Sequence, residues 1–434
     1  MPTVKGRRET LERLARAIGD RQEAILEALD RDLGKPRVEA YVAEYHFVLA
    51  EIREATRRLG SWARPRRVRN PFFYLPARSE IRREPHGRVL VISPWNYPFQ
   101  LAVSPLIPAV AAGNRVVLKP SECAPATAAL LAELVAEVFD PARVTVARGG
   151  AEVAARLLDE EFDFYFFTGG GRVGRLVAEA AARRPAPCVL ELGGKSPCLV
   201  APDADFEAAA DRIAAGKFFN AGQTCMAPDF VLVPEERREE FVARLEVLLG
   251  KWYGKGSKND LARIVNREHL DRLLSLAGAG ARVVGEDDPA ENRLAPRLVP
   301  DAGWDHPAMQ EEIFGPVLPV LGYGDWEEML ARAGALPPAL ALYVFSRSRG
   351  RFEEAAGAIR SGSVCFNDTM KQAANPALPF GGVGASGYGR YRGRAGFEAF
   401  SYPRAVTRRF FLPDLFALRP PYRGRLERLR RILK

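Results

Sequence analysis

The amino-acid sequence predicts an α/β protein built around a doubly wound parallel sheet. The chain has 434 residues, which is enough for two or three domains rather than one compact core. Short apolar runs that suit buried strands alternate with longer helical segments from residue 89 to residue 190. Strands separated by single helices are typical of a parallel sheet with helices on both faces.

The individual elements follow from apolar spacing and turn residues. Apolar residues three and four apart predict a helix over 11–29, a second helix is expected over 38–62, and the stretch 66–83 predicts an exposed hairpin or arm. In the alternating region we expect strands at 89–92, 116–118, 144–146, 162–167 and 188–190, with helices at 99–112, 124–139, 151–158 and 173–182. Beyond it we expect helices at 206–219 and 237–249, strands at 230–233, 342–345 and 363–366, and a loop-rich stretch over 278–307.

Charge and rare residue types argue against several classes of protein. The net charge of +9 comes largely from 57–69 and 404–434. These runs favour solubility over attraction to anionic lipid, and without interleaved aromatic residues they argue against nucleic-acid binding. Five cysteines without CxxC spacing and four histidines without an HExxH pair argue against a disulfide framework and a metal site. The charged N-terminus, with no long apolar run, predicts a cytoplasmic protein.

Two glycine-flanked turns carry residues that suit covalent chemistry. Cys225 ends the segment Phe-Phe-Asn-Ala-Gly-Gln-Thr-Cys at 218–225, and Glu191 begins Glu-Leu-Gly-Gly-Lys-Ser-Pro at 191–197. A thiol can attack a substrate while a carboxylate handles protons. Glu191 also follows a glycine-rich turn by about 20 residues, where an acid that binds ribose is expected, so spacing leaves both roles open.

Three more turns lie at the carboxyl ends of predicted strands. The segment 169–174 fits GxGxxG, which binds a phosphate at a helix N-terminus or makes a flexible turn. Lys119 and Glu122 suit either the hydroxyls of a ribose or a surface ion pair. Asn96, which lies between two prolines, offers an amide donor for an oxyanion and is equally an ordinary turn residue.

Taken together, these motifs resemble the aldehyde dehydrogenase superfamily, and specifically its class 3 branch. The similar segments run in family order: 93–100, 116–122, 167–174, 190–197, 218–228, 311–317 and 367–391. The short N-terminus, Trp-Asn-Tyr-Pro, Gly-Gln-Thr-Cys and Gly-Tyr-Gly-Arg-Tyr indicate class 3. The resemblance implies oxidation of an aldehyde to a carboxylic acid with NAD(P), through a cysteine thiohemiacetal and a thioester.

The resemblance also implies a role for each site residue. Cys225 matches the nucleophile, Glu191 the general base rather than a ribose binder, and Asn96 the oxyanion donor together with the backbone N–H of Cys225. Tyr97 and neighbouring aromatic residues favour medium-chain aliphatic or aromatic aldehydes, although such rings also serve core packing. The implied cofactor-binding residues are Lys119, Glu122, Gly169, Gly170, Gly171, Gly174, Glu312 and Phe314.

Gly170 departs from the family, which often has a helix-capping side chain at this position. We therefore expect a looser hold on the cofactor. Glu122 suits a free 2′-hydroxyl and repels a 2′-phosphate, which predicts NAD first, while Arg172 leaves NADP open. The Cys225 thiol is expected to be partly ionised by an electropositive environment from the cofactor and nearby helix ends.

The resemblance predicts how the chain is divided and what it binds. We expect a Rossmann-type cofactor domain over 1–65 and 84–191, an oligomerisation arm over 66–83, an α/β catalytic domain over 192–366, and over 367–434 a return to the cofactor domain followed by a dimerisation segment. A homodimer is therefore implied. The C-terminal apolar stripe favours packing on the protein or its dimer partner over an anionic membrane surface; it consists of Leu426, Leu429, Ile432 and Leu433.

Two other functions stay open from the sequence alone. A reductive relative would exchange the thioester with coenzyme A or reduce an acyl donor, but a hydrolytic base such as Glu191 does not help an enzyme that must preserve its thioester. A non-catalytic binding protein on the same fold is disfavoured because Cys225, Glu191 and Asn96 are all present.

Overall fold

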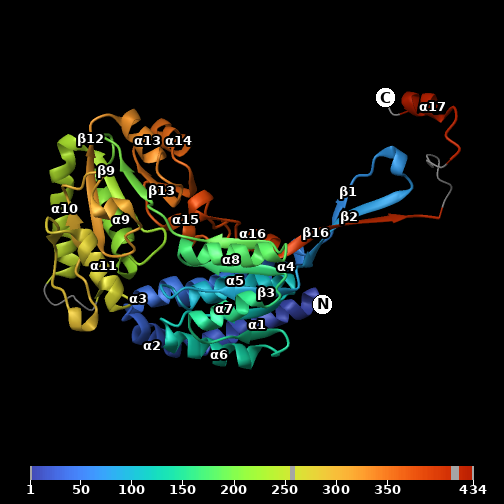
Figure 1. Ribbon diagram of the computed structural model, residues 1–434, viewed down its shortest axis with the longest axis horizontal. Coiled ribbons are helices and arrows are strands. Elements are labelled where there is room, and N and C mark those ends of the chain that lie inside the picture. Colours follow the sequence, from blue (N-terminus) through green and yellow to red (C-terminus); the bar gives the residue numbers. More distant parts are fainter. Residues whose placement is uncertain (1, 255–259, 412–419, 433–434) are drawn as a thin grey trace.

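The computed structural model describes residues 2–254, 260–411 and 420–432. These residues form two lobes and a projecting arm, and the chain passes from one lobe to the other and back (Figure 1). In the described part of the chain, the strands make one sheet of six strands, one of seven and one of three. Each lobe is built on one of the two larger sheets, and the three-stranded sheet forms the arm.

The six-stranded sheet has the order β15-β7-β6-β3-β4-β5, in which all strands but β15 are parallel. Its strands are β3 (Arg88–Ile92), β4 (Arg115–Lys119), β5 (Val144–Val146), β6 (Phe164–Thr168), β7 (Cys188–Glu191) and β15 (Gly387–Tyr388). In chain order, this sheet starts at β3, extends through β4 to β5, and then continues with β6 and β7 on the other side of β3. Ligands bind outside the carboxyl ends of strands at such a reversal. The predicted doubly wound parallel sheet is confirmed.

Helices that follow these strands cover the sheet. They are α5 (Gln100–Ala112), α6 (Pro125–Val138), α7 (Ala151–Asp159) and α8 (Gly171–Arg183). Every residue of α5 is buried, because the helix lies between the sheet and the N-terminal helices α1 (Val4–Gly19) and α4 (Phe47–Trp62). A helix that is apolar on all sides is typical of such an enclosed position.

The N-terminal region differs from the prediction in one respect. The single helix expected over 11–29 is two helices, α1 (Val4–Gly19) and α2 (Gln22–Leu33), because the backbone leaves helical geometry at Arg21. The expected second helix is continuous but mixed: α3 (Arg37–Ala40) runs through a π-helical turn, η1 (Tyr41–His46), into α4 (Phe47–Trp62). The extra backbone length of a π turn changes which residues share a helix face.

The seven-stranded sheet has the order β10-β11-β12-β9-β8-β13-β14 and is parallel except at β10. Its strands are β8 (Pro197–Val200), β9 (Phe230–Pro234), β10 (Arg282–Val283), β11 (Arg297–Val299), β12 (Val317–Tyr323), β13 (Ala339–Phe345) and β14 (Ser361–Phe366). Its longer helices are α9 (Phe206–Phe218), α10 (Arg238–Tyr253), α11 (Arg267–Ala277), α13 (Trp326–Gly334) and α14 (Arg349–Ala358). The sequence did not predict β8, β12, α11, α13 or α14, so this lobe is more regular than expected.

The arm contains three strands, not the two of a hairpin. The strand β2 (Ala77–Pro85) pairs antiparallel with β1 (Arg66–Val68) on one side and with β16 (Ser401–Arg409) on the other. The sequence did not predict β16, which follows the short helix α16 (Gly393–Ala399). The C-terminal helix α17 (Arg425–Ile432) lies beyond the arm, away from both lobes (Figure 1).

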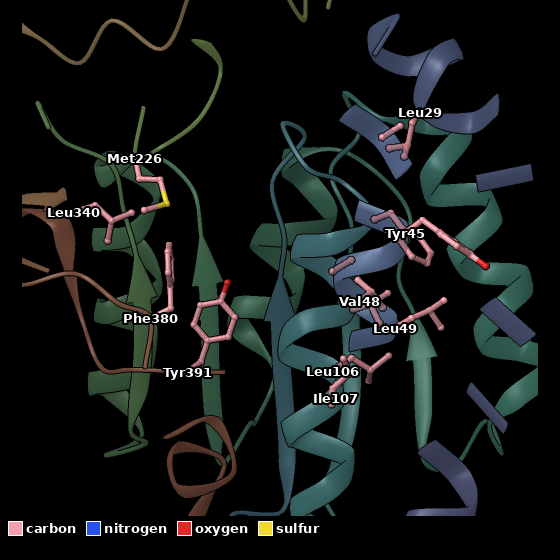
Figure 2. Close-up of a cluster of buried hydrophobic side chains, with 14 of the residues drawn as sticks. Leu29, Tyr45, Val48, Leu49, Leu106, Ile107, Met226, Leu340, Phe380 and Tyr391 are labelled. Atoms are coloured by element: carbon pink, nitrogen blue, oxygen red, sulfur yellow. The ribbon is translucent and has the colours of Figure 1, made fainter. Parts of the chain in front are cut away.

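One cluster of buried apolar side chains is continuous between the two lobes. Residues of its two ends appear in Figure 2, which labels Leu29, Tyr45, Val48, Leu49, Leu106 and Ile107 at one end and Met226, Leu340, Phe380 and Tyr391 at the other. The rings of Phe380 and Tyr391 meet edge to face, 5.7 Å apart between centroids. The returning segment that carries these two rings therefore helps to join the lobes.

Candidate active site

Cys225 is the last residue of a constrained loop that follows α9, here called the nucleophile loop (residues 219–225). Asn220 and Ala221 have left-handed backbone angles, with φ of 55° and 53°. Gly222 has φ of 73°, and a β-carbon there would lie 2.2 Å from the carbonyl oxygen of Gly315. Only glycine fits so close a backbone approach. The loop thus holds the partly buried Cys225 in one place.

The turn after β3 lies directly against this loop. The Asn96 side-chain amide donates to the backbone carbonyl of Gln223 at 3.0 Å. The Tyr97 hydroxyl is 2.7 Å from the Thr224 hydroxyl. Two predicted site residues therefore each contact a residue within two positions of Cys225, across more than a hundred positions of sequence.

Glu191 ends β7, and its carboxyl group has no hydrogen-bond partner among the described residues although it is buried. Burial raises the pKa of Glu191 well above its ordinary range, while the charges of Arg392 and Arg390 act in the opposite direction. A buried carboxyl group without partners is costly and is typical of a functional site. It suits a base that must take a proton close to neutral pH.

The electropositive environment expected from the cofactor and nearby helix ends stays a prediction, and burial and the nearby carboxylates act in the opposite direction on the Cys225 thiol. Burial raises the pKa of Cys225 to about 12, and the negative charges of Glu312 and Glu191 contribute to the increase. Arg392 is the cation that opposes them. In the protein alone the thiol is therefore neutral at physiological pH.

Glu312 and Phe314 lie on the segment that precedes β12. The Glu312 carboxyl packs against Gly193, where an added β-carbon would lie 2.0 Å from a carboxyl oxygen. Burial raises the pKa of Glu312 to about 8. Phe314 has a left-handed backbone (φ 53°), and its ring meets the Trp95 ring edge to face at 5.4 Å. This places Phe314 beside the turn that carries the Asn96 amide.

The predicted nucleotide residues lie at the carboxyl ends of strands on both sides of β3. The Lys119 ammonium, at the end of β4, donates to the Glu122 carboxylate at 2.7 Å. Although burial acts against ionisation, this bond helps to lower the pKa of Glu122 below its ordinary value. An ammonium and an ionised carboxylate side by side are the groups that a ribose diol requires.

The glycine-rich turn after β6 leads into the N-terminus of α8. A β-carbon at Gly170 or Gly171 would meet nothing within 4 Å, so the backbone there is open to a ligand. A β-carbon at Gly169 would lie 2.6 Å from the Phe167 ring, and one at Gly174 would lie 2.7 Å from Leu192. The turn and the Lys119–Glu122 pair fit a dinucleotide, because free N–H groups at a helix N-terminus bind phosphate.

Arg392 was not predicted as a site residue. It is buried, has φ of 75°, and donates to the Ala373 carbonyl at 2.6 Å. Its guanidinium lies 4.2 Å from the ring centroid of Phe380 and 3.7 Å from the Glu51 carboxylate. The sequence holds 63 lysines and arginines, and nothing local marks this one as buried. Its proximity to the Gly-Tyr-Gly-Arg-Tyr segment is the only available signal.

The described part of the chain comprises residues 2–254, 260–411 and 420–432. Within these ranges, no three histidine, cysteine, aspartate or glutamate side chains are grouped so that they could hold a metal ion. No helix in the same ranges combines the length and the apolar character needed to cross a bilayer.

Comparison with known proteins gives one consistent result. A sequence model of the "Aldehyde dehydrogenase family" matches residues 2–406. The 4,4'-diaponeurosporen-aldehyde dehydrogenase of Staphylococcus aureus is 40% identical over 99% of this chain and 95% of the relative, and aldehyde dehydrogenase family 3 member H1 of Arabidopsis thaliana is 39% identical over 98% and 89%.

Two solved structures extend the comparison. The substrate-bound state of Staphylococcus aureus AldH superimposes with a TM-score of 0.95 at 40% identity, covering 100% of this chain and 95% of that structure. An indole-3-acetaldehyde dehydrogenase complexed with NAD+ superimposes with a TM-score of 0.86 at 29% identity, covering 94% and 85%. The chain therefore belongs to the aldehyde dehydrogenase family and is an NAD(P)-dependent oxidoreductase that converts aldehydes to carboxylic acids.

Proposed function

We propose that Cys225 is the nucleophile, Glu191 the general base and Asn96 the oxyanion donor in this oxidation. The observation that carries the proposal is the hydrogen bond from the Asn96 amide to Gln223, two residues before Cys225. One N–H of the Asn96 amide is used in this bond, which leaves the other available to a substrate oxygen. The backbone N–H of Cys225 is the second proposed donor.

Each proton in the reaction can be followed. The Cys225 sulfur bonds to the aldehyde carbon as the thiol proton passes to solvent, and the carbonyl oxygen becomes an alkoxide held by the Asn96 amide. When bound, NAD supplies the acceptor for the hydride that leaves this carbon. The product on Cys225 is a thioester. Glu191 takes a proton from water, the hydroxide adds to the thioester carbon, and the carboxylic acid leaves as the released sulfur takes the proton back from Glu191.

The proposed cofactor contacts divide along the dinucleotide. Lys119 and Glu122 hold the adenosine ribose, and Glu312 and Phe314 position the nicotinamide end. NAD is preferred over NADP because the Glu122 carboxylate is ionised and repels a 2′-phosphate. The pyrophosphate contacts come from Gly169, Gly170, Gly171 and Gly174.

The proposed substrate has an apolar body. Tyr97 is buried and its hydroxyl is already bonded to Thr224, so it offers its aromatic ring rather than a polar group. This supports medium-chain aliphatic or aromatic aldehydes. Two relatives at 40% identity are named for 4,4'-diaponeurosporen-aldehyde and for 4,4'-diapolycopene-4,4'-dial, which adds these two compounds to the candidates.

We also propose a homodimer that uses the arm and the C-terminal segment. The arm projects from the lobes (Figure 1), and in the single chain Leu75 is about half exposed and Phe411 is fully exposed. Apolar side chains on a projecting element favour a partner that covers them. Sedimentation equilibrium of the full chain and of Leu75→Glu measures this directly.

Contact of α17 with anionic membrane is the less favoured alternative, and liposome sedimentation with and without residues 424–434 tests it.

The division into domains and the location of the protein are likewise proposals. The six-stranded sheet supports a cofactor domain from 1–65 and 84–191, and the seven-stranded sheet supports a catalytic domain from 192–366. Residues 367–434 first return to the cofactor domain and then provide the C-terminal dimerisation segment, whose strand β16 forms the arm together with 66–83. All five cysteines are unpaired, as in a reducing cytoplasm.

The deciding experiment is NADH absorbance with a panel of aldehydes of increasing chain length, with both NAD and NADP and with and without coenzyme A. The proposal expects NADH formation, a free carboxylic acid as product, and no effect of coenzyme A. An acyl-coenzyme A product would favour the reductive, acyl-transferring relative. No NADH with any aldehyde would favour a binding protein on the same fold.

A further inference from the structure

Three charged side chains reach the active-site turns from the N-terminal segment 35–46. We call Lys35, Glu39 and Glu44 the N-terminal charged trio. The Lys35 side chain is completely buried, forms an ion pair with Glu44, and donates to the backbone carbonyl of Asn96 at 2.9 Å. The trio thus touches the residue that carries the proposed oxyanion donor.

Glu44 fixes the other end of the same turn. One of its carboxylate oxygens accepts hydrogen bonds from the backbone N–H groups of Phe99 and Gln100, at 2.9 and 3.1 Å. These are N–H groups at the start of α5, which has no side-chain cap of its own. An acceptor and a negative charge are both favourable at a helix N-terminus. Lys35 and Glu44 therefore hold the turn from Asn96 to Gln100 at both ends.

Glu39 holds the nucleophile loop. Its carboxylate accepts from the backbone N–H of Asn220 at 2.9 Å, at the first of the two left-handed residues. The Asn220 side-chain amide in turn donates to the Asn96 carbonyl at 3.0 Å. The Asn96 carbonyl oxygen thus accepts one hydrogen bond from the Lys35 ammonium and one from the Asn220 amide. Both active-site segments meet at this oxygen.

The π-helical turn η1 explains how one short segment serves both turns. A π-helix pairs residue i with residue i+5, so residues five apart lie closer to one face than they do in an α-helix. Glu39 precedes this turn and Glu44 lies within it, five positions later. The change of helical phase brings both carboxylates toward the active-site side. Single π turns of this kind occur often at functional sites.

We propose that Lys35, Glu39 and Glu44 are positioning residues that set the distance between the oxyanion amide and the nucleophile. They act through Asn96 and Asn220 and do not touch the substrate. The inference rests on the proposed roles of Asn96 and Cys225. Every side-chain hydrogen bond that the structure shows from the trio to the rest of the protein ends on a backbone group of the turn 96–100 or of the nucleophile loop.

A buried ion pair is weak evidence for a stabilising role, because desolvation offsets most of the attraction. Misplacement of a catalytic group by about 1 Å can reduce a rate by about 100-fold. The trio is therefore expected to affect turnover more than folding. This separates the inference from the simpler interpretation of the trio as a structural tie, which predicts an effect on stability alone.

Glu39 gives the cleaner test. Glu39→Ala removes the acceptor for the Asn220 N–H, and we expect the rate of the NADH burst to fall by about tenfold with the KM for NAD within about twofold. Glu39→Gln keeps an acceptor oxygen and should restore a rate close to that of the unaltered protein. Asp32→Ala is the matched control. It likewise removes a carboxylate that accepts backbone hydrogen bonds, here from the N–H groups of Ala126 and Thr127 at the start of α6. It should lower the melting temperature and leave the burst rate unchanged.

A second test, at Lys35, is independent of Glu39. The double variant Lys35→Met, Glu44→Gln removes the donor to Asn96 without leaving a buried charge, and it keeps an acceptor for α5; we expect a similar loss of burst rate. Circular dichroism confirms folding of each variant. The inference would be overturned if Glu39→Ala and the double variant both fold and keep the burst rate of the original protein, provided that the original protein oxidises aldehydes. An unaltered protein that forms no NADH would instead refute the proposed function.

Discussion

The Asn96 side chain and the Gln223 carbonyl are joined by a hydrogen bond of 3.0 Å that links the carboxyl end of β3 to the nucleophile loop. The same carbonyl accepts from the Asn220 side chain at 3.1 Å. Removal of the Asn96 amide would therefore leave the Gln223 carbonyl with a partner. This separates a catalytic effect at Asn96 from a structural one, because no buried acceptor is left unsatisfied.

Asn96→Ala is expected to reduce kcat by about 100- to 1000-fold, since one donor to a developing oxyanion is typically worth that much. Its cost in stability should be about 1 kcal/mol, the usual net value of one hydrogen bond. Asn114→Ala is the matched control, because its buried amide donates to the Ala109 and Phe400 carbonyls away from the site. Stopped-flow NADH formation and thermal melting measure both. An equal loss of activity in the two variants would contradict the role of Asn96.

Glu191→Gln separates the two halves of the reaction. The glutamine fills the same space but cannot take a proton from water, so the acyl-enzyme should accumulate. We expect one NADH per active site in a burst, followed by a steady-state rate reduced by about 100-fold or more, and a mass increase on Cys225. Full steady-state turnover with only a weaker KM for NAD would restore the ribose-binding interpretation of Glu191.

The raised pKa of Glu191 predicts a specific pH dependence of deacylation. Burial favours the neutral carboxyl, so at pH values where an ordinary glutamate is fully ionised Glu191 is still partly protonated and cannot act as a base. The deacylation rate should therefore increase with pH beyond the ordinary carboxyl range. Single-turnover release of the acid over a pH series measures it, and the residual rate of Glu191→Gln should lack this increase.

The cofactor lobe was predictable because its strands are short apolar runs between clear turn residues. The catalytic lobe was less so: β12 has Pro319 and Gly322 inside it, which weaken the strand pattern, yet neighbours on both sides hold it in the sheet. The strand β16 pairs with β2 from more than three hundred positions away, and nothing local indicates such a partner.

Some residues of the candidate site were predictable from the sequence and others were not. Cys225, Glu191 and Asn96 stand in recognisable motifs, so the sequence marks them as candidates. Lys35 and Arg392 did not stand out, because a charged side chain usually lies at the surface and its burial depends on tertiary contacts. The pKa of Cys225 was also out of reach, since it depends on burial and on carboxylates that are distant in sequence.

Gly170→Ser is expected to stabilise the glycine-rich turn at the start of α8 and to strengthen NAD binding. Gly170 is the N-cap of α8, has φ −73° and ψ 149°, and a β-carbon there meets nothing. Serine suits this geometry and can accept a free N–H of the first turn, which is worth a few tenths of a kcal/mol relative to glycine. The melting temperature should rise slightly and the Kd for NAD should fall. Gly169→Ser is the control, because its β-carbon collides with the Phe167 ring and should destabilise the protein.

Glu122→Gln should shift the choice of cofactor. The substitution keeps the size of the side chain and removes the ionised carboxylate that Lys119 stabilises at 2.7 Å. Loss of repulsion toward a 2′-phosphate should raise the NADP-to-NAD ratio of kcat/KM by about tenfold, which corresponds to about 1.4 kcal/mol, a reasonable value for one like-charge contact near a surface. Glu133→Gln removes the same charge from the exposed face of α6 and should leave the ratio unchanged. An equal shift in both variants would show that net charge, rather than a contact with the ribose, controls the preference.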